Sequence, residues 1–103
     1  MVQIRKSKSD STLTISATGR LDTVTSADFE AELKASLDGI QELVLDFEEL
    51  DYVSSAGLRV ILAAHKQMAA AGGMTLRNVN DAIMEIFDMT GFSGILEIEG
   101  RGD

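Results

Sequence analysis

Apolar residues recur with two different periods along this 103-residue chain, and the way these periods alternate limits the possible folds. Residues 2–4 and 13–17 alternate between apolar and polar, and residues 43–47 form a short apolar run. Both patterns are typical of β-strands. Residues 74–79 alternate again, and residues 95–99 predict a last strand.

Between these predicted strands lie three segments with helical spacing of apolar residues. Each starts at a polar residue that can cap a helix and stops at a glycine. The predicted helices span residues 25–39, 54–72 and 80–91. Their apolar stripes are Phe29, Leu33 and Leu37; Leu58, Ile61, Leu62 and Met68; and Ile83, Ile86 and Phe87.

This order predicts an α/β fold with a mostly parallel mixed sheet of about five strands and three to four helices. Strands that alternate with helices are joined by right-handed crossovers. The polar connection at residues 6–11 is too short for a crossover, so the first strand is expected to join antiparallel at an edge. The length suits one domain over residues 1–103, with a frayed tail from about residue 100.

Charge and composition exclude several classes of function. The formal net charge of −8 disfavours nucleic acid and anionic membranes, which both require basic surfaces. The chain has no cysteine and one histidine, His65, which excludes disulfides, cysteine-ligated metals and multi-histidine metal sites. The longest apolar run, residues 60–64, is too short to span a bilayer. We therefore expect a cytoplasmic protein without a cofactor.

Functional groups in open parallel sheets gather at the carboxyl ends of the strands. Three segments are expected to meet there: residues 19–23, residues 48–55, and the pair Asn78 and Asn80. This argument places Asp22 and Ser55 on one rim of the sheet.

Ser54 and Ser55 stand at the start of the second predicted helix. One interpretation is that a serine only caps the helix, since serine is a preferred cap. A second is a site for an anionic group, which helix N-termini favour. A nucleophile is disfavoured, because His65 lies about 15 Å further along the helix and cannot act as its base. There is also no glycine-rich phosphate loop, so an enzyme is not expected.

Three segments resemble the STAS domain family, the anti-sigma factor antagonists. The segment LVLDFEELDYVSSAGLRVIL, residues 43–62, is similar to the family's signature. GRLDTVTSADFE, residues 19–30, resembles its second characteristic segment, and RNVNDAIMEIFDMTGFSGILEI, residues 77–98, resembles its C-terminal helix and strand. The resemblance covers nearly the whole chain and implies the same mixed sheet with one antiparallel edge strand.

The resemblance also implies a function. In such bacterial proteins a serine at the start of the second helix is phosphorylated by a partner kinase, which is also the anti-sigma factor. The unphosphorylated antagonist binds this kinase and frees the sigma factor. Phosphorylation breaks the complex, and a metal-dependent serine phosphatase of the PPM type restores it. Such a protein is expected to be a regulatory module, not an enzyme, and a monomer when free.

Aligned on Gly57 and Leu58, the family's phosphorylated serine falls on Ser55, with Ser54 as the weaker candidate. The family commonly has aspartate where this chain has Ser54, which leaves Ser54 available as the cap. Asp22 matches an aspartate that lies beside the phosphorylated serine. The resemblance implies a partner-binding surface of Asp22, Thr23, Ser54, Ser55, Ala56, Gly57 and Arg59.

A second role is compatible with the same resemblance. Some single-domain members are structural subunits of lipid-transport complexes, where the domain holds an ATPase. That role would not require phosphorylation of Ser55.

Overall fold

One mixed sheet with five strands organises the computed structural model, which describes residues 2–99. The strands are β1 (Val2–Ser9), β2 (Thr12–Leu21), β3 (Glu42–Asp46), β4 (Leu50–Val53) and β5 (Gly73–Arg77). The order is β1-β2-β3-β5, and β4 pairs with β2 beyond the end of β3. All pairs are parallel except β1 with β2, which confirms the predicted fold class and the antiparallel edge. The predicted fraying of the tail lies outside the described residues.

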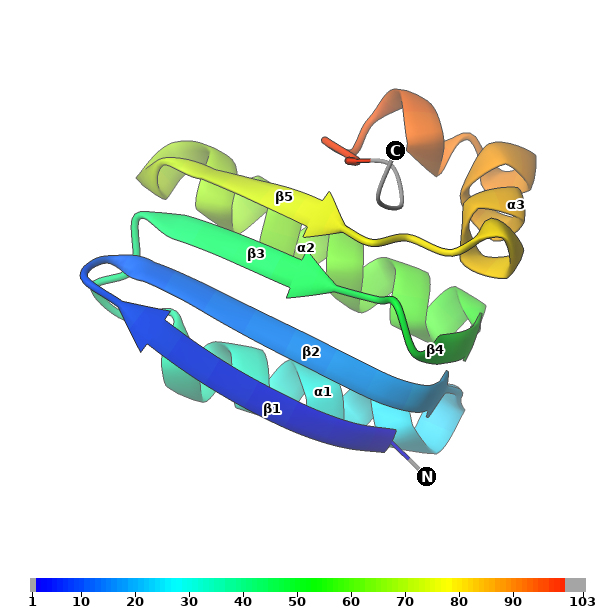
Figure 1. Cartoon of the computed structure of the whole chain (residues 1–103), viewed down its shortest axis with the longest axis horizontal. Coiled ribbons are helices and arrows are strands. Elements are labelled where there is room, and N and C mark those ends of the chain that lie inside the picture. The colour runs from blue at the N-terminus through cyan, green and yellow to red at the C-terminus, as the bar shows by residue number, and fades with distance from the viewer. Residues whose placement is uncertain (1, 100–103) are drawn as a thin grey trace.

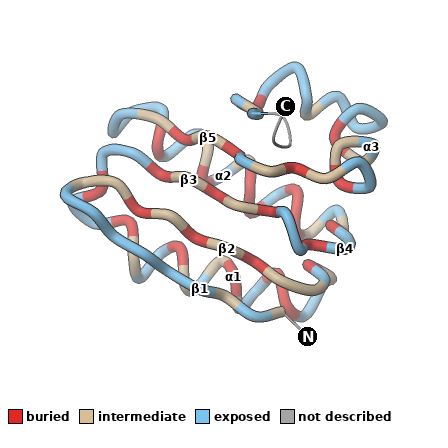
Figure 2. Tube along the Cα trace, in the orientation of Figure 1, coloured by how far each residue is buried: buried red, intermediate tan, exposed pale blue. Residues whose placement is uncertain are grey.

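Two long helices, α1 (Thr23–Ser36) and α2 (Ser55–Ala71), pack side by side on one face of the sheet (Figure 1). Buried and half-buried positions alternate along β2 (Figure 2), where Leu13, Ile15 and Ala17 are buried. These apolar side chains, their neighbours on β3 and β5, and the buried faces of the helices form the core. Within residues 2–99, no helix has the length and hydropathy required to cross a membrane.

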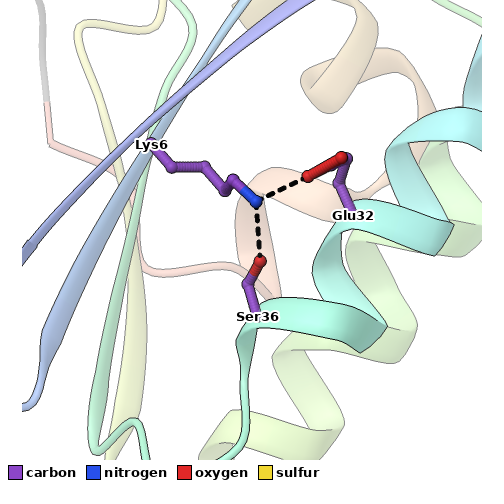
Figure 3. Close-up of polar contacts among 3 residues, drawn as sticks. All are labelled: Lys6, Glu32 and Ser36. Atoms are coloured by element: carbon purple, nitrogen blue, oxygen red, sulfur yellow. Dashed lines mark hydrogen bonds and ion pairs between the residues drawn. The ribbon is translucent and has the colours of Figure 1, made fainter.

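The edge strand β1 is longer than the sequence predicted. Residues 6–9 were expected in the connection, yet β1 pairs with β2 until Ser9 opposes Thr12. The turn is short and includes Asp10 in the left-handed region at φ 56°. Lys6 explains part of the extension, because its Nζ reaches Glu32 Oε2 at 2.7 Å and Ser36 Oγ at 3.3 Å on α1 (Figure 3). A polar side chain such as Lys6 is therefore compatible with this strand, because it has partners on α1.

Strand β4 was not predicted, because residues 48–55 were expected to be a loop. Its buried residues, Leu50 and Val53, are three apart and enclose two exposed residues, so the strand lacks the usual period of two. β2 also continues to Leu21, and α1 begins at Thr23, two residues before the predicted start. These differences matter because both helices that carry the candidate site start at this edge.

The prediction of a last strand over residues 95–99 is wrong. A short 3-10 helix, η1 (Phe92–Gly94), precedes this segment, and only a single bridge joins Ile98 to Leu76 of β5. The N–H groups of Ile95 and Leu96 both donate to the carbonyl of Phe92, at 2.9 Å each. Because the turn uses these two donors, pairing with β5 is limited to the bonds of Leu76, whose N–H donates to the Glu97 carbonyl and whose carbonyl accepts from the Glu99 N–H. The third helix, α3 (Asp81–Thr90), is capped by Asn80 and ends at Gly91, as predicted.

Two of the three predicted glycine stops are confirmed. Gly72 is the C-cap of α2 and Gly91 that of α3, whereas the C-cap of α1 is Leu37, two residues before Gly39. Gly72 is required for a steric reason, since a Cβ atom there would lie 2.0 Å from the backbone oxygen of Gln41. No backbone atom can tolerate that approach, so the chain would have to move.

We predict that Gly72→Ala destabilises the protein by about 1–3 kcal/mol, the range for a side chain forced into a filled space. Urea unfolding of the purified chain measures this change. Gly94→Ala is the matched control, because a Cβ atom at Gly94 meets nothing within 4 Å. Equal unfolding midpoints for the two variants would contradict the steric argument.

Candidate functional site

The N-termini of α1 and α2 meet where β2 and β4 end. Leu21 of β2 pairs with Val53 of β4, and the N–H of Ser54 donates to the carbonyl of Leu21 at 2.8 Å. Asp22 directly follows one partner of this hydrogen bond, and Ser55 directly follows the other. The structure therefore brings Asp22 and Ser55 to the same edge of the sheet.

Gly57 allows α2 to approach this edge closely. A Cβ atom there would lie 2.9 Å from Val53 Cγ1, 3.1 Å from Leu21 Cβ and 3.2 Å from the Leu21 oxygen. Real Cβ atoms do not reach such distances to several partners at once. A larger residue would push the first turn of α2 away from β2, together with Ser54 and Ser55.

Asp22 is the N-cap of α1 and forms a capping box with Thr25. Its Oδ1 accepts from the N–H groups of Val24 at 3.0 Å and Thr25 at 2.9 Å. Thr25 Oγ1 accepts from the N–H of Asp22 at 2.9 Å. The Thr25 N–H, followed by the Thr25 hydroxyl, lowers the pKa of Asp22, because both stabilise its ionised carboxylate. Asp22 is thus a fixed negative charge at this edge.

The two serines have different environments. Ser54 is half-buried and is the N-cap of α2, where its Oγ accepts from the Gly57 N–H at 3.2 Å. Ser55 is exposed and is the first residue of the helix. The capping interpretation therefore applies to Ser54. Ser55 presents its hydroxyl at the positive end of a 17-residue helix whose first turn has no acidic residue.

A groove of about 400 Å³ runs between α1 and α2 beside the two serines. Thr23 at the start of α1, and Ala56 and Arg59 in the first turns of α2, contribute to its walls. The remaining lining residues are Ser26, Ala27, Glu30, Val60 and Ala63. Of the predicted surface residues, Thr23 and Arg59 are exposed, Ala56 is half-buried, and Gly57 is buried.

Asn78 and Asn80 lie at the carboxyl ends of β3 and β5, as expected, and their side chains bind neighbouring groups of the chain. Asn80 Nδ2 donates to the carbonyls of Phe47, Glu48 and Leu50, at 3.3, 3.2 and 2.8 Å, while its Oδ1 caps α3. Asn78 Nδ2 donates to Asp46 Oδ2 at 3.1 Å. Both side chains are used to hold the segment that leads into β4, so we assign them a structural role.

The single histidine of the chain lies far from the candidate site. His65 lies ten residues after Ser55 on α2, about 15 Å along the axis, and cannot serve as its base. In the part of the chain that the structure describes, no three side chains of metal-binding type come together. An exposed hydroxyl at a helix N-terminus can still receive an anionic group.

Sequence reasoning missed two features here. The guanidinium of Arg20 stacks over the ring of Tyr52, 4.6 Å from its centroid, across the β2–β4 pair. The groove between the helices was also missed. The Arg20–Tyr52 contact could not be foreseen without strand β4, whose pairing with β2 sets the two residues opposite each other. The alanines at 27, 56 and 63 were the available signal for the groove, because small side chains leave space between helices.

The capping box predicts a measurable effect of Thr25 on Asp22. The pKa of Asp22 lies below its ordinary value of 3.8, so its contribution to stability is present above the unfolded pKa and lost as pH falls through the folded one. Thr25→Val removes the hydroxyl and should raise the pKa of Asp22 toward 3.8. Thr25→Ser retains the hydroxyl and is the control. Carbon-13 NMR titration of the carboxyl follows both, and equal values for the two variants would exclude a role for the hydroxyl.

Comparisons with known proteins agree with this architecture. The STAS domain profile matches residues 3–101. A relative from Bordetella bronchiseptica, BtrV, is provisionally named an anti-sigma factor antagonist. It is 34% identical over 99 residues, which cover 94% of this chain and 85% of BtrV.

Solved structures show the same fold at lower identity. An anti-sigma factor antagonist from Mycobacterium paratuberculosis has a TM-score of 0.86 at 20% identity, over 95% of this chain and 85% of its own. The antagonist SpoIIAA, in its unphosphorylated form, has a TM-score of 0.82 at 17% identity, over 98% and 90% of the two chains. Its phosphorylated form, from Bacillus, has 0.75 at 18% identity, over 98% and 93%. By its profile match, and by its identity to BtrV, this chain belongs to the STAS domain family.

Proposed function

We propose that this chain is an anti-sigma factor antagonist that works by partner switching. Unphosphorylated, it binds an anti-sigma factor that is also a serine/threonine kinase. Phosphorylated at Ser55, it releases that kinase. The observation that carries the proposal is the difference between the two serines at the start of α2. Half-buried Ser54 caps the helix, whereas Ser55 is exposed and does not act as the cap. The names of BtrV and SpoIIAA support the antagonist role.

The site suits a switch because a phosphate would change the surface without disturbing the fold. Phosphoserine adds a charge of about −1.5 to −2 and three acceptor oxygens. At the N-terminus of α2 the helix dipole favours this charge by about 0.3–1 kcal/mol. The cap itself is unaffected, because Ser54 makes it.

For the partner, the same change is unfavourable. The phosphate would stand at the edge that already carries the ionised Asp22. A partner surface matched to a neutral hydroxyl would meet a bulky dianion there. Each loss of about 1.4 kcal/mol is a tenfold loss of affinity, so a modest clash releases the partner.

The proposed partner surface consists of the rim and the start of the groove: Asp22, Thr23, Ser54, Ser55, Ala56 and Arg59. Gly57, which was expected in this surface, is buried and sets the position of the first turn of α2. Most of these side chains are small, which favours close approach by a second protein. A PPM-type serine phosphatase would return the chain to its binding form. We propose that the chain acts in the cytoplasm and is itself a substrate, not an enzyme.

Ser55 should be the residue that the kinase modifies. Ser55→Ala should abolish incorporation of labelled phosphate from ATP by the purified partner kinase. Ser54→Asn removes the other hydroxyl but keeps a good helix cap, so it should still be phosphorylated. Peptide mapping by mass spectrometry locates the phosphate. Labelling of Ser55→Ala with loss in Ser54→Asn would move the site to Ser54.

Binding should depend on the charge at the same position. Ser55→Ala should bind the unmodified kinase with nearly the affinity of the parent chain, whereas Ser55→Asp should bind at least about tenfold more weakly. Isothermal titration calorimetry measures both, and circular dichroism verifies that both are folded. Parental affinity in a folded Ser55→Asp variant would argue against the switch. Affinity capture that returns a transport ATPase, with Ser55 unmodified, would favour the structural-subunit role.

A further inference from the structure

Arg59 lies one helical turn beyond Ser55 on α2. Side chains four residues apart on a helix are neighbours, with Cβ atoms about 5–6 Å apart. Each Cα–Cβ bond also tilts toward the helix N-terminus, so the side chain of residue 59 leans toward residue 55. Both residues are exposed, and Arg59 contributes to the wall of the groove between α1 and α2.

The guanidinium of Arg59 is not committed to a carboxylate. Among residues 2–99, the ion pairs join Lys6 to Glu32 and Lys34 to Glu30. The other arginine near this edge, Arg20, is stacked over Tyr52. Arg59 therefore stays available as a positive charge in a chain with a net charge of −8.

We propose that a phosphate on Ser55 binds the guanidinium of Arg59 within the same helix and draws it away from the groove. This rests on the proposed function, in which Ser55 is phosphorylated. A planar guanidinium can donate two parallel hydrogen bonds to phosphate oxygens, which makes arginine well suited to this contact. The order of the pair, with the anion nearer the N-terminus and the cation four residues later, is the favourable one for a helix.

The consequence is that one modification changes two parts of the partner surface. The rim gains a dianion, and the groove loses its exposed cation. A partner carboxylate that pairs with Arg59 in the unmodified complex would lose its counterion when Ser55 is phosphorylated. Arg59 is thus a positioning residue of the switch, which carries the effect of Ser55 into the space between α1 and α2.

The test is a phosphorus-31 NMR titration of chain in which phosphoserine is installed at position 55 during translation. The second pKa of phosphoserine is ordinarily near 6. It should be lower in the parent chain than in Arg59→Gln by about 0.3 unit or more, a twofold or greater change in proton dissociation. The helix dipole and Asp22 are the same in both chains, so the difference isolates Arg59. It should shrink in 1 M salt, where the screening length is about 3 Å.

Two further variants make the result decisive. Lys66→Gln removes an exposed positive charge from the same helix, two turns beyond Arg59, and should leave the phosphate pKa unchanged. Arg59→Lys keeps the charge without the planar fork and should give an intermediate value. Equal pKa values in the parent chain and in Arg59→Gln would overturn the proposal, as would an equal effect of Lys66→Gln.

The failure of this inference can be distinguished from the failure of the proposed function. The phosphate is installed without the kinase, so the titration does not depend on which residue the kinase selects. If the kinase modifies Ser55 but Arg59→Gln has no effect on the titration, only the contact is disproved. If Arg59 shifts the phosphate pKa but the kinase does not modify Ser55, the contact exists and the switch is disproved.

Discussion

The close approach of α2 to the end of β2 is the constraint on which the candidate site depends. Gly57 permits it, because any Cβ atom there would collide with Leu21 and Val53. The hydrogen bond from the Ser54 N–H to the Leu21 carbonyl then fixes the helix start to the strand end. Since Asp22 follows Leu21 directly, the same contact sets both helix N-termini at one edge of the sheet. The packing of α2 against the end of β2 thus places Asp22 and Ser55 on one surface.

Folding and regulation are separated at this edge by the use of two adjacent serines. Ser54 satisfies the Gly57 N–H and stabilises the first turn of α2. Ser55 makes no such contribution and faces solvent. A group added to Ser55 would therefore meet the dipole of α2 and the charges of Asp22 and Arg59, while the cap stays intact. This arrangement allows a large change of surface charge at little cost to the fold.

Much of the fold could be predicted because its signals are local. The alternation of Leu13, Ile15 and Ala17 identified a strand with one buried face, and the serines, Asn80, Gly72 and Gly91 identified helix ends. Strand β4 escaped prediction because its buried residues, Leu50 and Val53, are not two apart. The last strand was predicted wrongly because residues 95–99 have strand-like side chains, whereas the N–H groups of Ile95 and Leu96 turn back to Phe92. The hydrogen-bond partner of a backbone N–H depends on the surrounding structure, so it cannot be predicted from the pattern of apolar and polar residues.

By itself, the sequence determined the class of fold, a mostly parallel sheet with an antiparallel first strand, and the presence of a serine pair at a helix start. Hydrophobic period and capping preference are properties of neighbouring residues, so they can be followed along the chain. The tertiary structure alone decided which serine caps α2, and it alone opened the groove between α1 and α2. Within residues 2–99, it also left Arg59 without a carboxylate partner. The groove and the surroundings of Arg59 depend on distances between segments far apart in the chain, and such distances are fixed only when the helices pack against the sheet.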